Sequence, residues 1–315
     1  MLSKPVFIVG AHKSGTSLLR SLLDGAPGLF VFPKEPHYFS YVGWPVSYPL
    51  RRQAAAEDPR EHLRRSLEAD NRDTNPYSDL PDFAGWDLGR FWTALGDDDL
   101  DYPNYIRALR VALTGSNGRE RVVDKSTENI EFVPILAQWF PDASFLHVIR
   151  NPYANLVSIR RYKMKRLGRY PVMYEPAAGL RFSVDAIARN QRIAENYSVV
   201  RYEDVVQQTE HTMRRVAEHI GIDFVDELLR PTVLGELWGG NSTTDRVFSR
   251  VSIDPLERWK ADITLFERAL AVEALRPYFD GFGYEREPAG RTLLPSKHEG
   301  PRTYFVNRAL LRLPW

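Results

Sequence analysis

The stretch from Pro5 to Arg20 constrains the fold of this chain more than any other part of the sequence. Val6 to Val9 is a short apolar run in which three of four residues are β-branched, and this indicates a buried parallel strand. Gly10 and Gly15 bound a tight loop, and the apolar spacing from Thr16 to Leu23 predicts a helix packed against a sheet. In such a unit the loop N–H groups and the positive end of the helix point at one spot. The sequence therefore predicts an anion-binding loop.

The residues inside this loop indicate which kind of anion it holds. Loops that bind ATP or GTP follow the pattern G-x-x-x-x-G-K-[ST], with a lysine directly after the second glycine. Here the two glycines keep that spacing, but Thr16 stands at the lysine position and Lys13 lies within the loop. A lysine at this place reaches the far end of a short 5′ group better than a triphosphate. A glycine-rich turn that binds no ligand is the alternative interpretation.

Composition excludes several classes of protein and leaves the partners open. The 315 residues include 42 Lys and Arg against 41 Asp and Glu, so the net charge of +1 is that of an ordinary soluble globular protein and by itself identifies no partner. We expect no nucleic-acid partner. With no cysteine, and with seven histidines that lack H-E-x-x-H spacing, no metal site is expected. The first strand follows the N-terminus without a charged leader, and no run approaches 18 apolar residues. We expect a cytoplasmic protein with no membrane span.

Strands and helices are predicted to alternate along the chain, which favours a three-layer α/β fold with a mainly parallel central sheet flanked by helices. Residues 40–103 are irregular and contain one predicted helix; we interpret them as an insertion that covers the site and shapes an acceptor pocket. Residues 235–252 are rich in Gly, Ser, Thr and Asn, and their Ser242–Ser249 part is predicted to close over a nucleotide. Residues 286–315 form a tail with no assignment. Beyond the first unit, the predicted strands are Leu29–Phe32, Arg121–Asp124, Ala143–Ile149 and Val199–Val200, and the predicted helices cover 58–67, 101–113, 152–162, 177–196, 203–220 and 262–278.

Polar side chains follow several of these strands and supply candidate chemistry. Arg150 ends a predicted strand and Ser158 lies eight residues later on the following helix, so together they can bind a phosphate. Glu35 lies in the loop after the second predicted strand, and Lys125 lies in the loop after the third. Parallel strands bring such loops to one edge of a sheet.

Taken together, these motifs resemble those of the sulfotransferases that use 3′-phosphoadenosine-5′-phosphosulfate (PAPS). The run from Lys13 to Ser17 resembles their 5′-phosphosulfate loop, and the pair Arg150 and Ser158 resembles their 3′-phosphate site. The stretch Lys34-Glu35-Pro36-His37-Tyr38-Phe39 is similar to the K-E-x-H-F-F segment of the heparan-sulfate 3-O-sulfotransferases, whose glutamate is the base. Asp124-Lys125-Ser126 resembles the E-K-[ST] segment of carbohydrate sulfotransferases, with Asp in place of Glu.

The resemblance implies a P-loop-type fold, a single domain over residues 1–285, and sulfuryl transfer from PAPS to a hydroxyl acceptor, with 3′,5′-bisphosphoadenosine as product and no metal. The acceptor it favours is a carbohydrate or a glycosylated metabolite, while lipid alcohols, polyketide hydroxyls and peptide tyrosine stay open. Tyr202 and Arg258 resemble late cofactor contacts of the protein-tyrosine branch. The implied catalytic residues are Glu35, Lys13, Lys125 and His37, and the implied cofactor-binding residues are Lys13, Ser14, Gly15, Thr16, Ser17, Arg150, Ser158, Tyr202 and Arg258.

Each assignment has a purely structural alternative. Arg150 could form a salt bridge that stabilises the fold, Glu35 could pair with Lys34 or Lys125, and His37 could be an ordinary packed side chain. The seven basic residues between Arg150 and Arg169 are typical of a solvated helix face, or they attract an acidic ligand. The aromatic residues Tyr38, Phe39, Tyr41, Trp44 and Tyr48 either stack on sugar rings or belong to the core. For the whole chain, the alternatives are an ATP-dependent small-molecule kinase and a non-catalytic nucleotide-binding protein of the same fold.

Overall fold

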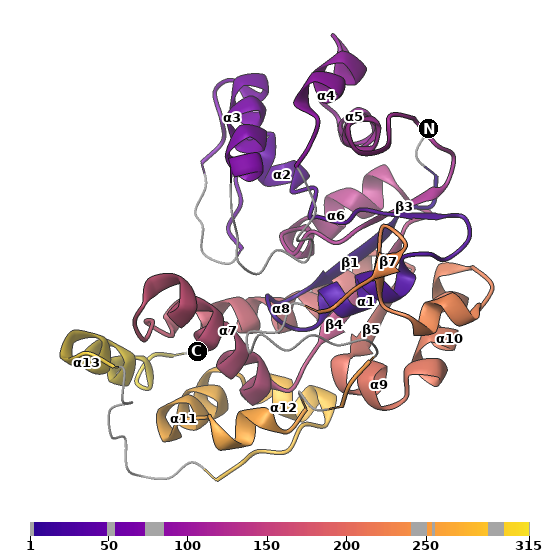
Figure 1. The fold of residues 1–315 in the computed structure, drawn as a ribbon. Helices are drawn as coiled ribbons and strands as arrows, with labels where there is room; N and C mark the ends of the chain where they lie inside the picture. Colours follow the sequence, from indigo (N-terminus) through magenta and orange to yellow (C-terminus); the bar gives the residue numbers. More distant parts are fainter. Residues whose placement is uncertain are drawn as a thin grey trace.

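The predicted three-layer α/β fold is confirmed by a computed structural model, which describes residues 3–48, 54–72, 85–240, 251–253, 256–288 and 299–314. The central sheet is parallel throughout, with strand order β2-β3-β1-β4-β5 (Figure 1). Strand β1 lies in the middle, so the loop that follows it is flanked by the ends of β3 and β4. The strands are β1 (Val6–Gly10), β2 (Leu29–Val31), β3 (Arg121–Asp124), β4 (Ser144–Ile149) and β5 (Tyr197–Arg201).

Alternate side chains of β1 enter two different cores, which is why the sheet carries helices on both faces. Phe7 and Val9 pack with the helices on one face, and Val6 and Ile8 pack with those on the other. A third cluster holds the later helices together beyond β4. The flanking helices are α1 (Thr16–Leu23), α6 (Asn129–Trp139), α7 (Pro152–Leu167), α8 (Tyr174–Ile193), α9 (Tyr202–Gln207), α10 (Thr209–Ile220), α11 (Leu265–Ala274) and α12 (Arg276–Phe282).

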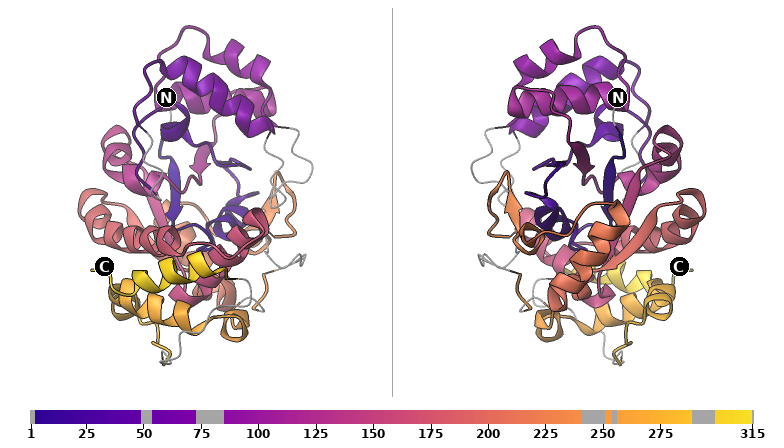
Figure 2. Two further views of the ribbon diagram at one scale, coloured as in Figure 1. Left: turned by 90° about the vertical axis from the view of Figure 1, so that its left-hand side faces the viewer. Right: turned by 90° about the vertical axis from the view of Figure 1, so that its right-hand side faces the viewer.

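The segment interpreted as an insertion is more helical than the sequence predicts. It begins within α2 (Tyr38–Tyr41) and contains α3 (Pro59–Arg72) and α4 (Leu88–Leu95), and α5 (Tyr102–Thr114) starts just before its end. Figure 2 shows α3, α4 and α5 at one end of the molecule and the C-terminal helices at the other, with the sheet between them. Helix α4 was not predicted, although Asp87 caps it by accepting a hydrogen bond from the Arg90 N–H.

The aromatic residues after Glu35 serve the core rather than an open binding surface. Tyr38, Phe39 and Tyr48 are buried, and the Phe39 ring stacks on Phe132 of α6 with centroids 3.8 Å apart. The interpretation of these three residues as a platform for sugar rings is therefore wrong. Burial of their rings instead fixes the start of the inserted segment against the sheet.

Two predicted helices are each divided in the structure. The expected helix 203–220 consists of α9 and α10, because Gln208 leaves the helical region with φ −134° and ψ 52°. The expected helix 262–278 consists of α11 and α12, because Pro277 at the start of α12 cannot donate the N–H that would continue α11.

The remaining elements are short. They are the 3₁₀ helices η1 (Asp226–Leu229) and η2 (Arg258–Ala261), the antiparallel pair β6 (Thr232–Val233) and β7 (Glu236–Leu237), and α13 (Pro301–Leu310) within the unassigned tail. The Ser242–Ser249 segment, predicted to close over a nucleotide, lies outside the described residues. None of the helices in the described ranges is long and apolar enough to cross a bilayer.

Candidate active site

The loop after β1 has the backbone geometry of an anion-binding turn. Lys13 and Gly15 both have positive φ, +63° and +105°, and the Ser14 N–H donates to the Ala11 carbonyl over 3.1 Å. Gly15 precedes α1 and makes no side-chain cap, and the positive end of the helix dipole lies at the loop. Ser14 is fully buried, and its hydroxyl has no hydrogen-bond partner. An unsatisfied buried hydroxyl in such a loop fits a site built for an anion.

Arg150 and Tyr202 close over this loop from the ends of the next two strands. The Arg150 Nη1 donates to the Lys13 carbonyl over 3.2 Å, and its guanidinium lies 4.4 Å from the centre of the Tyr202 ring. A Cβ atom added to Gly15 would lie 2.3 Å from Cδ2 of Tyr202, so only glycine fits there. The structure thus brings Lys13, Gly15, Arg150 and Tyr202 into one cluster, although they come from three separate strand ends.

Helix α7 borders the loop on the side of Lys13. The Lys13 ammonium lies 4.8 Å from the centre of the Tyr162 ring, and Ser158, which is half-buried, lies one turn before Tyr162 on the same helix. Arg258 belongs to η2, which packs on α7 because the Trp259 ring stacks on Tyr153 at 5.1 Å. Ser158 and Arg258 therefore lie on or beside α7, outside the loop itself.

Glu35 lies at the same edge of the sheet and is bound by the loop that follows β3. Its Oε1 accepts from the Lys125 ammonium over 2.5 Å, and its Oε2 accepts from the Thr127 N–H over 3.0 Å and from the Thr127 hydroxyl over 3.2 Å. The sequence offered Lys34 and Lys125 as ion-pair partners of Glu35. The structure shows the ion pair of Glu35 with Lys125, whereas Lys34 pairs with Asp70 of α3 at 2.6 Å.

The electrostatic surroundings of Glu35 favour its charged form. Burial alone would raise the pKa of this carboxyl, but the charge of Lys125, the neighbouring His37 and the hydrogen bonds from Lys125 and Thr127 outweigh burial. The net result is a pKa well below the usual range of a glutamate. Glu35 is therefore an ionised carboxylate paired with a buried ammonium.

His37 lies between two carboxylates, one of which sequence reasoning missed. Its Nε2 is 3.6 Å from Glu35, and its Nδ1 is 3.3 Å from Oε2 of Glu128, while the other Glu128 oxygen accepts from the Ser40 N–H. Burial raises the pKa of Glu128, but the His37 and Ser40 contacts lower it overall. The backbone of His37 has φ +52° and its N–H donates to the Ser126 hydroxyl. Glu128 could have been found as a further acidic residue in the loop after β3.

The loop after β3 is fixed in place by Asp124. This carboxylate is fully buried and accepts hydrogen bonds from the Tyr102 hydroxyl, the Ser126 hydroxyl and the Asn129 amide at 2.7–3.0 Å. Burial raises the pKa of Asp124, and the three donors oppose that rise. Because Tyr102 belongs to α5, Asp124 joins that helix to the Lys125 loop.

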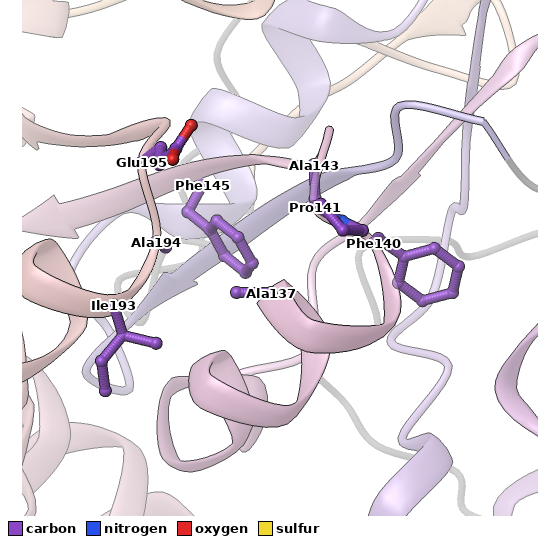
Figure 3. A pocket seen from close by; sticks show the side chains of 8 residues that line it. All are labelled: Ala137, Phe140, Pro141, Ala143, Phe145, Ile193, Ala194 and Glu195. Atoms are coloured by element: carbon purple, nitrogen blue, oxygen red, sulfur yellow. The ribbon is translucent and has the colours of Figure 1, made fainter.

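A pocket of about 160 Å³ lies away from these residues, at the amino end of the sheet (Figure 3). It is lined by residues at the ends of α6 and α8 and before β4, among them Ala137, Phe140, Phe145, Ile193 and Glu195. None of the residues that line the pocket belongs to the cluster around Lys13 and Glu35. No group of three metal-ligating side chains occurs within the described ranges.

The fold and the site together define a class of protein. A parallel α/β sheet carries an anion-binding loop after its central strand, with an arginine against the loop and an acid–base cluster beside it. The sequence profile of the sulfotransferase family matches residues 5–226, which is more than half of the chain. The chain therefore belongs to the sulfotransferase family.

Solved structures of similar fold agree with this family. The sulfotransferase domain of the Synechococcus PCC 7002 olefin synthase superposes with a TM-score of 0.54 at 22% identity, covering 91% of this chain and 97% of that one. The sulfotransferase domain from the curacin biosynthetic pathway gives a TM-score of 0.53 at 16% identity, covering 91% and 99%. No curated protein sequence matches the chain. At these identities the likeness shows the fold.

Proposed function

We propose that this protein transfers a sulfuryl group from PAPS to a hydroxyl of a carbohydrate or a glycosylated metabolite. The observation that carries the proposal is the contact between the Arg150 guanidinium and the Lys13 carbonyl, 3.2 Å apart. The two residues follow different strands, and their contact supports a site in which one nucleotide reaches both the loop and Arg150. PAPS carries phosphate at both ends of its ribose, and it supplies the sulfuryl group when bound.

The residues around the loop fit such a co-substrate. The N–H groups of Gly15, Thr16 and Ser17 and the buried Ser14 hydroxyl are donors for the 5′-phosphosulfate, and Lys13 balances charge on the bridging oxygen. Arg150 and Ser158 are the proposed ligands of the 3′-phosphate. We assign Tyr202 to the nucleotide as well, since it already packs on both the loop and Arg150. Arg258 is assigned to the nucleotide on its resemblance to the late cofactor contacts alone.

Glu35 is the proposed general base, and its ion pair with Lys125 is part of the proposal. In the resting site the ammonium holds the carboxylate ionised and makes it a weak base. A sulfuryl group beside Lys125 would offer the ammonium a second anionic partner, and Glu35 would then bind the proton of the acceptor hydroxyl more strongly. His37, held on its other side by Glu128, would orient the acceptor hydroxyl towards Glu35.

The acceptor site is proposed to lie under the inserted helices. Residues 1–285 would form one transferase domain, in which 40–103 cover the acceptor. The support for this position is a contact between the residues beside Glu35 and helix α3. Lys34, next to Glu35, forms an ion pair with Asp70 of α3, and the same carboxylate accepts a hydrogen bond from the Trp86 indole. The similarity of Lys34–Phe39 to the heparan-sulfate 3-O-sulfotransferases favours a carbohydrate acceptor.

A sulfate-transfer assay with radiolabelled PAPS and a mixed acceptor panel tests the activity. We expect label to pass to sugar hydroxyls, and no transfer to any acceptor class would contradict the proposal. A thermal-shift comparison separates it from a kinase, which is disfavoured because Thr16 replaces the usual lysine. Stabilisation by 3′,5′-bisphosphoadenosine but not by ATP with magnesium is expected, and the reverse would favour the kinase.

A further inference from the structure

Apolar side chains that contact water gather at one corner of the molecule, where the end of α7 meets α13. Six large hydrophobic residues of this corner are between 39% and 71% exposed, and Phe305 is the most exposed of them. We call this surface the α7–α13 corner and define it by those residues: Leu167, Val172, Tyr174, Phe305, Val306 and Leu313. A gathering of large exposed apolar side chains in one region of the fold is typical of an interaction surface.

The corner is one surface because α13 is bound to the segment between α7 and α8. The Asn307 side chain accepts from the Met173 N–H over 2.8 Å and donates to the Pro171 carbonyl over 3.2 Å. Figure 1 shows α13 next to the C-terminal part of α7. Helix α13 buries Thr303, Asn307 and Leu310.

The opposite face of α13 is exposed and has the residue pattern of an interfacial helix. Phe305 and Val306 lie three and four residues after Arg302, Ala309 lies three and four residues after Val306 and Phe305, and all four residues are exposed. Phe305 and Val306 thus form an outward apolar stripe that begins at an arginine.

Basic residues surround the apolar side chains. Residues 165–175 and 299–313 contain six Lys and Arg and two acidic residues. Both acidic side chains are already paired, Glu175 with Lys163 at 2.7 Å and Glu299, 1% exposed, with Arg308 at 3.0 Å. The corner is therefore both apolar and positively charged. Lys165, Arg166 and Arg169 of this corner belong to the basic run from Arg150 to Arg169, of which the proposed nucleotide site uses Arg150.

We propose that the α7–α13 corner binds the surface of a membrane that contains anionic lipids. Apolar side chains would enter the headgroup region while the surrounding lysines and arginines meet lipid phosphates, as in peripheral amphipathic helices. The centre of a protein–protein interface is usually depleted in charge, which fits this mixed surface less well. The inference does not depend on sulfuryl transfer.

Docking at this corner would bring the lipid surface near the loop after β1. Tyr162, which contacts Lys13, lies five residues before Leu167 on α7, about 7.5 Å along the helix. The carboxyl edge of the sheet would therefore lie close to the lipid surface.

Co-sedimentation of the full chain with vesicles tests the proposal. We expect binding to vesicles of phosphatidylcholine mixed with phosphatidylglycerol, little binding to phosphatidylcholine alone, and release at high salt. Phe305→Ser should weaken binding about tenfold, because burial of a phenylalanine contributes at least that factor. Arg169→Glu combined with Arg302→Glu should weaken it more than tenfold at low salt.

Matched variants on other surfaces serve as controls. Leu237→Ser removes an exposed apolar residue on β7, and Arg119→Glu reverses an exposed charge before β3. Both should bind vesicles like the unmodified chain, and thermal melting of all variants checks that they fold. Failure to bind mixed vesicles, or equal losses in Phe305→Ser and Leu237→Ser, would overturn the proposal. So would light scattering that shows a dimer which Phe305→Ser converts to a monomer without any vesicle binding.

Discussion

The ion pair between Glu35 and Lys125 allows the catalytic and the structural effects of one substitution to be separated. Glu35→Gln keeps the shape of the side chain and an oxygen that can accept from Thr127, but it removes the negative charge. Lys125, only 6% exposed, would then be a buried ammonium without its carboxylate. Breaking one partner of such a pair costs about 3 kcal/mol, because the remaining charge stays desolvated.

The turnover of Glu35→Gln should also fall, for a reason that is separate from its loss of stability. Without the carboxylate, no group at this position can take the acceptor proton, and general-base catalysis contributes on the order of a hundredfold or more. Co-substrate binding should remain nearly intact, because Arg150 and the loop are unchanged. Initial rates of sulfate transfer, calorimetry with 3′,5′-bisphosphoadenosine and denaturant unfolding measure the three quantities.

The double variant Glu35→Gln, Lys125→Met is the control. Removing the ammonium as well should restore most of the lost stability, since no uncompensated charge remains buried, while turnover should stay low. Turnover of Glu35→Gln within a fewfold of the unmodified enzyme would remove Glu35 from the role of base. A double variant no more stable than Glu35→Gln would show that the ion pair does not carry the stability assigned to it.

Three further predictions concern single side chains. Gly15→Ala should abolish bisphosphate binding in calorimetry, because φ is +105° and the new Cβ would lie 2.3 Å from the Tyr202 ring; binding like that of the unmodified chain would contradict this. Glu128→Gln should lower kcat about tenfold with an unchanged KM for PAPS and a shifted pH profile, because His37 loses its second carboxylate; an unaltered profile would exclude this positioning role. Burial lowers the pKa of His147 to about 3 in the folded protein, whereas the same side chain in the unfolded chain has a pKa of about 6.5. As the pH falls below about 6.5, His147 therefore becomes protonated in the unfolded chain while it stays neutral in the folded protein. Stability should therefore drop by about 2 kcal/mol between pH 7 and pH 5 through this residue, a loss that urea unfolding should not find in His147→Gln.

Local sequence signals were sufficient for the strand, loop and helix at the start of the chain. Short β-branched runs, glycines with positive φ and apolar helical spacing depend on neighbouring residues, so β1, the loop and α1 were predicted close to their observed limits. The parallel order of the strands then explains why Glu35, Lys125 and Arg150 meet at one edge, although they are far apart in sequence.

Features that depend on tertiary contacts were not predictable in the same way. Helices α9 and α10 are separated at Gln208, and no glycine or proline lies next to this residue in the sequence. The local sequence therefore gives no sign of the break. Helix α6 was missed because Pro134 interrupts its pattern, and its burial against the core compensates for the proline. The partnership of His37 with Glu128 joins two loops and becomes visible only when both are in place.

Calorimetric titration of 3′,5′-bisphosphoadenosine tests most directly whether one nucleotide spans the loop after β1 and the end of β4. The unmodified chain should bind it, and Arg150→Ala should bind roughly a hundredfold more weakly, because about 3 kcal/mol of charge-assisted hydrogen bonding is lost. Arg121→Ala, at the opposite edge of the sheet, should bind like the unmodified chain. Equal affinities for Arg150→Ala and the unmodified chain, or no binding by either, would contradict the account.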